Sequence, residues 1–270
     1  MKGTPRERAD GPRRPRWGEF QAPGPEIFEF PPLFAGGPEW LTKPVVLAVA
    51  GALIVSIFCW SAFAKPKLVP RGVQNVGEIG YVFVRDQIAR PFLGKNTERW
   101  MPLLMSVFLL VWIWNIFAVI PVIQFPVTSH IAFPIVLALF IYFIKIYLGI
   151  KHQGPVKYFT NLIPPGLPKP VYFLLVPIEY LSTFILAPFT HAVRLFANMF
   201  AGHMILAFFS LVGFWFLIEK PTALGFGVGI IGVIVTIAMT AFELLIQFLQ
   251  AFLFTMLAAM YIQSGLHADH

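Results

Sequence analysis

Two long apolar stretches in the C-terminal half constrain the fold of this chain more than any other feature. Val171 to Leu217 has 47 residues and Thr222 to Ile262 has 41. As single helices they would each be about 60 to 70 Å long, whereas the apolar core of a bilayer is about 30 Å thick. Each stretch is therefore either a hairpin of two upright spans, broken near Pro188 or Gly232, or one inclined helix. No cluster of polar turn residues accompanies either break. We therefore predict two long helices, inclined about 60° or more from the membrane normal.

The composition indicates an integral membrane protein. Of the 270 residues, 57% are hydrophobic and 12% are charged, whereas soluble domains carry about 25% charged residues. The net charge of +7 could indicate a nucleic-acid binder, but most of the surplus lies beside apolar stretches, as in loops that fix membrane topology. We expect the lipid bilayer as a partner and no nucleic acid. The single cysteine, Cys59, excludes a disulfide framework or a thiolate metal cluster, and we expect no metal and no cofactor.

Three shorter apolar stretches precede the two long ones. Pro44 to Phe63, Met101 to Ile123 and Ile131 to Ile150 each have about the 20 residues that span a bilayer. Val73 to Phe92 instead alternates at helical spacing, which is typical of a helix lying in the membrane interface. Its predicted apolar stripe holds Val76, Ile79, Val82, Phe83 and Ile88, with Glu78, Arg85 and Asp86 elsewhere. We therefore predict an all-α polytopic membrane protein with five membrane-crossing helices and one interfacial amphipathic helix.

The charges of the loops predict the topology. Segments 65–99 and 151–170 are basic, whereas 122–130 contains no Lys or Arg, so the positive-inside rule places the N-terminus outside and the C-terminus in the cytoplasm. Ala62-Phe63-Ala64 could be a signal-peptidase site, but the preceding tail is long for a signal peptide. We predict an outer polar tail (1–43), a first transmembrane helix (44–64), a cytoplasmic segment with the interfacial helix (65–99), a transmembrane hairpin (100–150), a cytoplasmic loop (151–170), the pair of long helices (171–264) and a cytoplasmic C-terminus (265–270).

Arg194 is the most informative single residue. It lies in HAVRLFANMFAGH, residues 191 to 203, and a guanidinium keeps its charge at any relevant pH. In a bilayer core that charge costs from about 2.5 to more than 10 kcal/mol. An arginine that reaches the headgroups from a helix end, or that is paired within a core, is the alternative, but apolar residues continue for several turns on each side. On a helix, Asn198, His191 and Ala201 lie within about 60° of Arg194, on a small, polar face that another helix can approach.

The second long stretch carries a polar stripe of its own. Glutamines at such positions can simply join helices by hydrogen bonds worth about 0.6 to 2 kcal/mol each, but an ionisable residue among them indicates a function. The stripe consists of Glu243, Gln247, Gln250 and Tyr261. A different stripe at small-x-x-x-small spacing, where a neighbouring helix can come close, consists of Gly225, Gly229, Gly232, Thr236 and Thr240.

RLFANMFAGH, together with FELLIQFLQAFLFTMLAAMYIQ, resembles the a subunits of F-type ATP synthases. The two motifs cover about the last 80 residues, and segments 44–170 match in order and spacing. The resemblance implies that Arg194 is the essential arginine, with Asn198 and Gln250 as its neighbours. It implies a proton-translocating stator subunit that provides two half-channels separated by Arg194, and that does not itself catalyse ATP formation. The implied partners are a ring of c subunits and a b-subunit peripheral stalk, in a bacterial plasma membrane.

The sequence departs from the common family pattern near the arginine. Bacterial members commonly carry a carboxylate nine residues after the arginine and a histidine seven before the glutamine, but this chain has His203 and Glu243 at these places. If the long helices run antiparallel and cross near Arg194 and Gln250, both groups lie about 10 to 14 Å outward from the crossing. An imidazole titrates near neutral pH, so we predict that His203 and Glu243 form a proton relay.

Three points about this proton path are left open by the sequence. His191 and Gln247 are further candidates for the path. Because Ala118 stands where some relatives place an acidic residue, Ser129 and His130 are candidates for lining the outer entrance. On a straight helix His203 lies about 180° from Arg194, so either the helix curves or the relay lies behind the arginine face.

Two other classes of protein compete with this interpretation. A secondary transporter could use Arg194 to bind the carboxylate or phosphate of a solute, but such folds usually show paired repeats, and the two long stretches share no motif. A purely structural subunit of a respiratory complex is the other alternative. A structural subunit would not explain why the ionisable residues His203 and Glu243 lie at matching depth. We expect protons to be the only small substrate of this protein.

Overall fold

The computed structural model describes residues 22–28, 31–34, 38–120, 123–160, 169–219 and 221–266. Most of the predicted tail and of segment 265–270, and part of the loop 151–170, lie outside these ranges. Within them every regular element is a helix and no strand occurs. The α-helices are α1 (Lys43–Phe63), α2 (Val73–Val84), α3 (Arg90–Leu93), α4 (Thr97–Ile116), α5 (Ala132–Gln153), α6 (Pro155–Thr160), α7 (Lys169–Leu181), α8 (Ala187–Phe214) and α9 (Ala223–Leu266). The shorter 3₁₀ and π turns are η1 (Pro25–Phe28), η2 (Arg85–Ala89), η3 (Gly94–Asn96), η4 (Val127–Ser129), η5 (Ser182–Leu186) and η6 (Trp215–Glu219).

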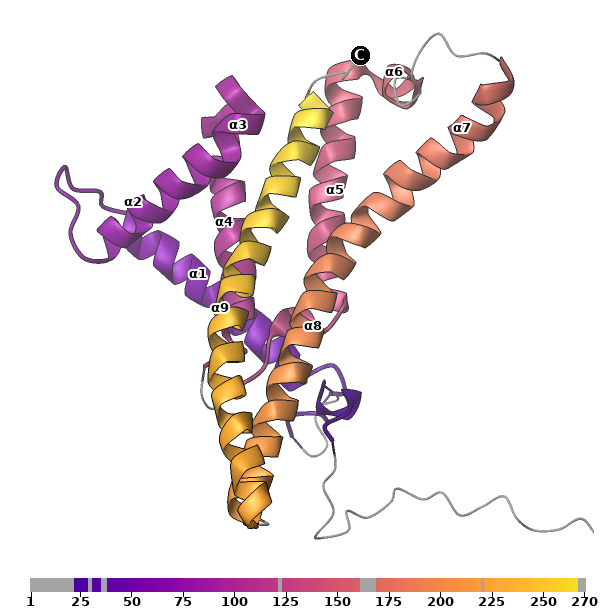
Figure 1. The fold of residues 1–270 in the computed structure, drawn as a ribbon. Helices are drawn as coiled ribbons and strands as arrows, with labels where there is room; N and C mark the ends of the chain where they lie inside the picture. The colour runs from indigo at the N-terminus through magenta and orange to yellow at the C-terminus, as the bar shows by residue number, and fades with distance from the viewer. Residues whose placement is uncertain are drawn as a thin grey trace, which may run out of the picture.

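Five helical stretches of the described chain are long and apolar enough to cross a membrane. They are Lys43–Phe63, Val73–Ile116, Ala132–Gln153, Val171–Glu219 and Ala223–Leu266, which confirms the predicted all-α fold with two long helices at its end. Figure 1 shows α9 running through the bundle, and its neighbours are α4, α5 and α8. The main hydrophobic core lies among these four helices and extends to α3 and η2. The turn between α8 and α9 lies at the end of the bundle opposite to the C-terminus (Figure 1).

The first long stretch is one continuous helix rather than a hairpin. Val171–Glu219 is helical over 49 residues, and Pro188, the candidate break, lies just inside the start of α8. Proline has no N–H to donate to the preceding turn, and the π turn η5 immediately before it locally widens the helix. The helix therefore continues past Pro188, and the chain does not turn back there. Gly232, the other candidate break, lies inside the unbroken α9. The inclination of both helices to a membrane stays a prediction.

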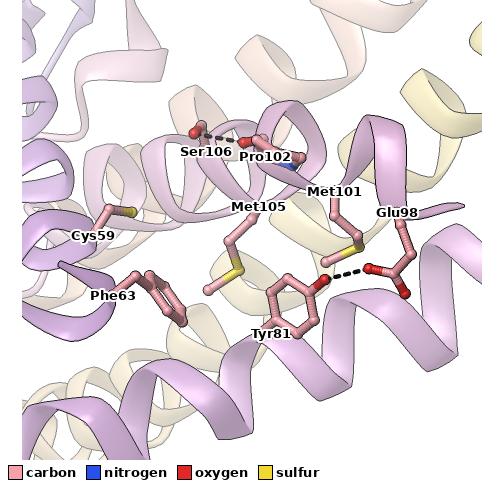
Figure 2. A pocket seen from close by; sticks show the side chains of 8 residues that line it. All are labelled: Cys59, Phe63, Tyr81, Glu98, Met101, Pro102, Met105 and Ser106. Atoms are coloured by element: carbon pink, nitrogen blue, oxygen red, sulfur yellow. Dashed lines mark hydrogen bonds between the residues drawn. The ribbon is translucent and has the colours of Figure 1, made fainter. Parts of the chain in front are cut away.

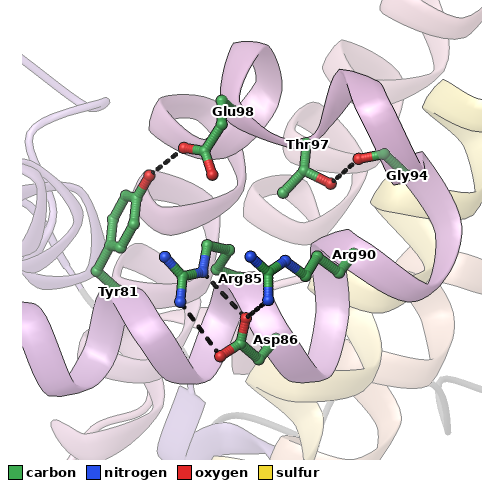
Figure 3. Close-up of polar contacts among 7 residues, drawn as sticks. All are labelled: Tyr81, Arg85, Asp86, Arg90, Gly94, Thr97 and Glu98. Atoms are coloured by element: carbon green, nitrogen blue, oxygen red, sulfur yellow. Dashed lines mark hydrogen bonds and ion pairs between the residues drawn. The ribbon is translucent and has the colours of Figure 1, made fainter.

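The chain reverses between α3 and α4 at Gly94. Gly94 has a φ of 49°, a conformation that costs little only for glycine, and the Thr97 hydroxyl donates to the Gly94 carbonyl at 2.7 Å. Figure 3 shows this turn beside an ion-pair cluster, in which Asp86 bonds Arg85 at 3.0 Å and Arg90 at 3.1 Å. These contacts hold α2, η2 and α3 as one arm that packs on α1 and α4.

The predicted apolar stripe of this arm is split between two surroundings. Val76, Ile79 and Val82 are exposed, whereas Ile88 is fully buried in the core. The prediction that Ile88 shares one stripe with these residues is therefore wrong, because six residues of helix turn its side chain about 120° away from that of Val82 and toward the core.

A groove of about 350 Å³ lies between α1, α2 and α4. Its walls are mainly apolar, with Met101 and Met105 on one side and Phe63 on the other, and the Tyr81 hydroxyl donates to Glu98 at 2.7 Å at one end (Figure 2). Cys59 also lines the groove. None of its lining residues belongs to α8 or α9, so the groove is separate from the polar residues of the two long helices.

Helix α4 ends at Ile116, earlier than the predicted end at Ile123. The amide of Ala118 donates to Asn115 O at 3.0 Å and that of Val119 to Ile116 O at 3.0 Å, which turns the chain away from the helix axis. Phe125 N then donates to Phe117 O at 3.2 Å. The connection to α5 therefore folds back over the end of α4, where it contributes to the site described below.

Candidate functional site

Helices α8 and α9 pack antiparallel. His191 packs on Phe254, Gly202 lies beside Glu243 and Gly213 lies beside Gly232, so each step of 11 residues along α8 is matched by a step of 11 residues back along α9. Beyond this stretch the Tyr261 hydroxyl donates to Ala187 O at 3.5 Å. In this register Arg194 lies level with Ala251, next to Gln250, the place at which a crossing was assumed from the sequence.

Arg194 lies on the exposed face of this helix pair. Ala197, Asn198 and Ala201 are exposed with it, whereas Leu195 between them is buried. A charged side chain thus stands on a surface of small residues about halfway along a 49-residue apolar helix. Such a surface allows the close approach of a neighbouring helix, and a guanidinium is suited to hold a carboxylate of that helix.

His191 does not share this exposed face, although it lies only about 60° from Arg194 around the helix. It is 2% exposed, and its ring centroid lies 3.9 Å from that of Phe254 and 5.6 Å from that of Tyr261. The expectation of one polar face containing both residues is therefore wrong, because α9 covers the side of α8 on which His191 lies. Tyr261 in turn packs on Tyr142, and the Lys145 ammonium lies 5.3 Å from the Tyr261 ring.

The polar stripe of α9 faces the interior of the bundle. Glu243 is 4% exposed, Gln247 0% and Gln250 5%. Glu243 and Gln247 lie one turn apart, but neither side chain forms a hydrogen bond of ordinary geometry with the described residues. A buried polar group without a partner costs roughly 1 to 3 kcal/mol, and such groups are typical of functional sites.

Asn115 connects this stripe to the loop before α5, a contact that the sequence did not predict. Its side-chain amide donates to the backbone carbonyl of Gln247 at 3.5 Å, and its carbonyl oxygen accepts a hydrogen bond from the Thr128 hydroxyl. Both Asn115 and Thr128 are fully buried. The interruption of an apolar span by an asparagine is the one sequence signal that could have indicated this link.

His203 lies behind the arginine face, beside a polar pocket. Helix α8 is uninterrupted from Arg194 to His203, and nine residues of α-helix turn the imidazole to the far side of the helix from Arg194; the relay itself stays a prediction. The pocket has a volume of about 240 Å³ between α8, α9 and the end of α4. Besides His203, its polar lining consists of Gln124, Ser210, Thr236 and Thr240.

The two loop residues expected near the outer entrance have other contacts. The Ser129 hydroxyl donates to Pro126 O at 2.7 Å, and His130 Nε2 lies 2.8 Å from the carbonyl oxygen of Phe28. Neither residue lines the pocket. The threonine stripe of α9, which we expected only to permit close helix packing, supplies the pocket wall instead. Within the described residues no group of three or more His, Cys, Asp or Glu side chains is arranged to hold a metal ion.

Comparisons with known proteins match nearly the whole chain. The model of the family described as ATP synthase A chain matches residues 45–263. A protein of Streptomyces lividans named ATP synthase subunit a is 44% identical over 259 residues, which cover 93% of this chain and 89% of that protein. Proteins of the same name from Frankia alni and Rhodococcus erythropolis are each 43% identical over 93% of this chain, and the matches cover 88% and 92% of their lengths.

Proposed function

Because this chain belongs to the ATP synthase A chain family, the proton-translocating membrane subunit of F-type ATP synthases, we propose that Arg194 separates two half-channels built on α8 and α9. The chain is a multi-pass membrane protein that works in a complex with other subunits. In the proposed mechanism protons approach from outside past His203 and Glu243. They then load a carboxylate on a neighbouring ring of c subunits and leave on the cytoplasmic side after the ring has turned.

The exposure of Arg194 is the observation that carries this proposal. A guanidinium that served only to hold the bundle together would be buried against a carboxylate of the chain itself, but Arg194 lies among exposed small residues. We propose that this surface faces the ring and that Asn198 lies beside the passing carboxylate. Arg194 holds the unprotonated carboxylate there, and its fixed charge prevents protons from crossing directly between the half-channels.

The pocket beside His203 supports an outer half-channel. Its hydroxyl and amide lining can bind water, and Glu243 lies one turn beyond Thr240 on α9, at the level of Gly202. An ideal methyl group on Gly202 would lie 3.7 Å from Glu243 Oε1, which is an ordinary contact and places the carboxylate against α8 one residue before His203. In the proposed path a proton passes from His203 to Glu243, and Gln247 and Gln250 continue the stripe toward the level of Arg194.

Along α8, His191 lies on the other side of Arg194 from His203. The packing of His191 on Tyr261 supports a place for it in the inner half-channel. Basic segments 65–99 and 151–170 then lie in the cytoplasm, with the tail outside and the C-terminus inside. The exposed Val76, Ile79 and Val82 support an interfacial position for α2. We further propose a b-subunit stalk as the second protein partner, a bacterial plasma membrane as the location, and no ATP-forming catalysis by the chain itself.

Substitution of Arg194 tests the proposal. Arg194→Ala and Arg194→Gln should abolish ATP-driven proton pumping in inverted vesicles while the complex still assembles. Arg194→Lys should fail too, since a compact ammonium does not reproduce the planar fork of a guanidinium. Thr190→Ala, on the same exposed side of α8 and with a hydroxyl that donates to Ala187 O within its own helix, is the matched control and should pump normally. Robust pumping by Arg194→Ala would refute the proposal.

A secondary transporter for an anionic solute is not favoured by the family match. A direct measurement also distinguishes an ATP synthase subunit from a secondary transporter. Gentle isolation of this chain should copurify an ATPase activity that carbodiimides, which block the ring carboxylate, inhibit. A transporter would be isolated without such an activity and would show solute binding that depends on Arg194.

A further inference from the structure

Phe28 anchors the described part of the N-terminal segment to the candidate proton path. Phe28, at the end of η1, is 5% exposed, whereas Phe34 in the same part of the chain is 63% exposed. The ring of Phe28 stacks on Phe200 with centroids 4.6 Å apart and meets His203 edge-on at 5.7 Å. Its carbonyl oxygen accepts a hydrogen bond from His130 at 2.8 Å. The segment is therefore held both by its side chain, on α8, and by its backbone, on the loop before α5.

The contact with Phe28 bears on the orientation of the His203 ring. The Nδ1 atom of His203 is buried, and no described residue forms a hydrogen bond with it. Ring packing, to which Phe28 contributes, therefore helps to restrain the imidazole. His203 also belongs to the wall of the polar pocket. One side of the imidazole is thus covered by Phe28, and another borders the pocket.

We propose that Phe28 is a positioning residue for proton transfer, which holds the His203 imidazole in place and closes its outer side against water. The pocket then remains the route by which water reaches the imidazole. Proton transfer requires donor and acceptor within about 2.6 to 3.2 Å, so a loosened ring transfers protons more slowly. This inference rests on the proposed place of His203 in the proton path.

Thiol labelling tests whether Phe28 covers His203. The parent is the assembled complex with Cys59→Ser and His203→Cys in this chain, in right-side-out vesicles, labelled with a membrane-impermeant maleimide. Adding Phe28→Ala should raise the labelling rate by about tenfold or more, because local opening controls access to a covered site. Phe28→Leu, which keeps most of the apolar volume, should stay near the parent rate, and Phe34→Ala should leave it unchanged.

An unchanged rate with Phe28→Ala, measured per assembled chain, would overturn the inference. If Phe28→Ala lowers the amount of assembled complex, Phe28→Val gives the same test with a smaller loss of volume. This labelling does not depend on proton flow, so its outcome stands whether or not His203 carries protons.

Pumping measurements then test the positioning role in the native His203 chain. Phe28→Ala should lower ATP-driven pumping by about threefold or more, with Phe28→Leu restoring most of it. The same Phe28→Ala change should have little further effect when His203→Ala is already present, because residues that act through one another are not additive. An equal further loss would overturn the positioning role. Normal pumping by His203→Ala alone would instead refute the proposed proton path.

Discussion

The close approach of α8 and α9 at Gly232 allows a stability prediction with a matched control. A methyl group on Gly232 would lie 2.8 Å from Gly213 N, 3.0 Å from Gly213 Cα and 3.3 Å from Phe209 O. All three are backbone atoms, which cannot rotate away, so the helices must separate. Overpacking of this kind costs about 1 to 3 kcal/mol, and the better helix propensity of alanine offsets at most about 1 kcal/mol. Gly232→Ala should therefore destabilise the packed helix pair by a net amount of about 1 kcal/mol.

Limited proteolysis of the reconstituted complex measures this effect. A loss of about 1 kcal/mol raises the population of the separated pair about fivefold, and cleavage tracks that population when opening is fast. Gly227→Ala, in the same helix and with no atom within 4 Å of the added methyl group, should be neutral or slightly protective. Equal cleavage rates for the two variants would refute the reasoning, because they differ only in what the methyl group meets.

Three further predictions follow from the polar contacts and the exposed face. The exchange His203→Glu with Glu243→His should retain much of the pumping that each single change loses, an interaction of about 1 to 3 kcal/mol; additive losses in inverted vesicles at matched complex content would count against the relay. Asn115→Leu leaves the buried Thr128 hydroxyl without its acceptor and should lower stability by roughly 1 to 3 kcal/mol; thermal dissociation of the complex should occur at a lower temperature, and an unchanged temperature would contradict this cost. Ala197→Cys, on the exposed face, should crosslink to a cysteine on a c-subunit helix, whereas the fully buried position of Met199→Cys should not; the reverse result would place the ring elsewhere.

The fold was largely predictable because apolar length is a local property of the chain. The 47 and 41 apolar residues of the long stretches, with no turn cluster, predicted unbroken helices, and the helical stretches Val171–Glu219 and Ala223–Leu266 confirm them. The end of α4 was not predictable in the same way. Apolar residues continue past Ile116, but hydrogen bonds to Asn115 O and Ile116 O turn the chain there.

The positions of the site residues along the helix axes were predictable from the sequence, but the directions in which their side chains point were predictable only in part. Helical spacing along one chain gives the angle between two side chains, which correctly placed His203 opposite Arg194. It does not give the side on which the next helix lies, and so His191 was expected beside Arg194 although α9 covers it. The contacts of Phe28 with His203 and of Asn115 with α9 join residues far apart in sequence. No periodicity within a segment contains that information.

The backbone contact between Gly213 and Gly232 also has a mechanical consequence. At this point the two long helices meet main chain against main chain, without the flexible side chains that would act as a cushion between them. Packed protein interiors have low compressibility and transmit strain, so we expect the α8–α9 pair to be stiff where Gly213 meets Gly232. On the proposed function this pair faces a turning ring and has to resist torque, and any movement between the helices that dissipates energy lowers the share that reaches ATP. The proposal thus gives the two glycines a part in the efficiency of coupling, in addition to their part in the packing of the fold.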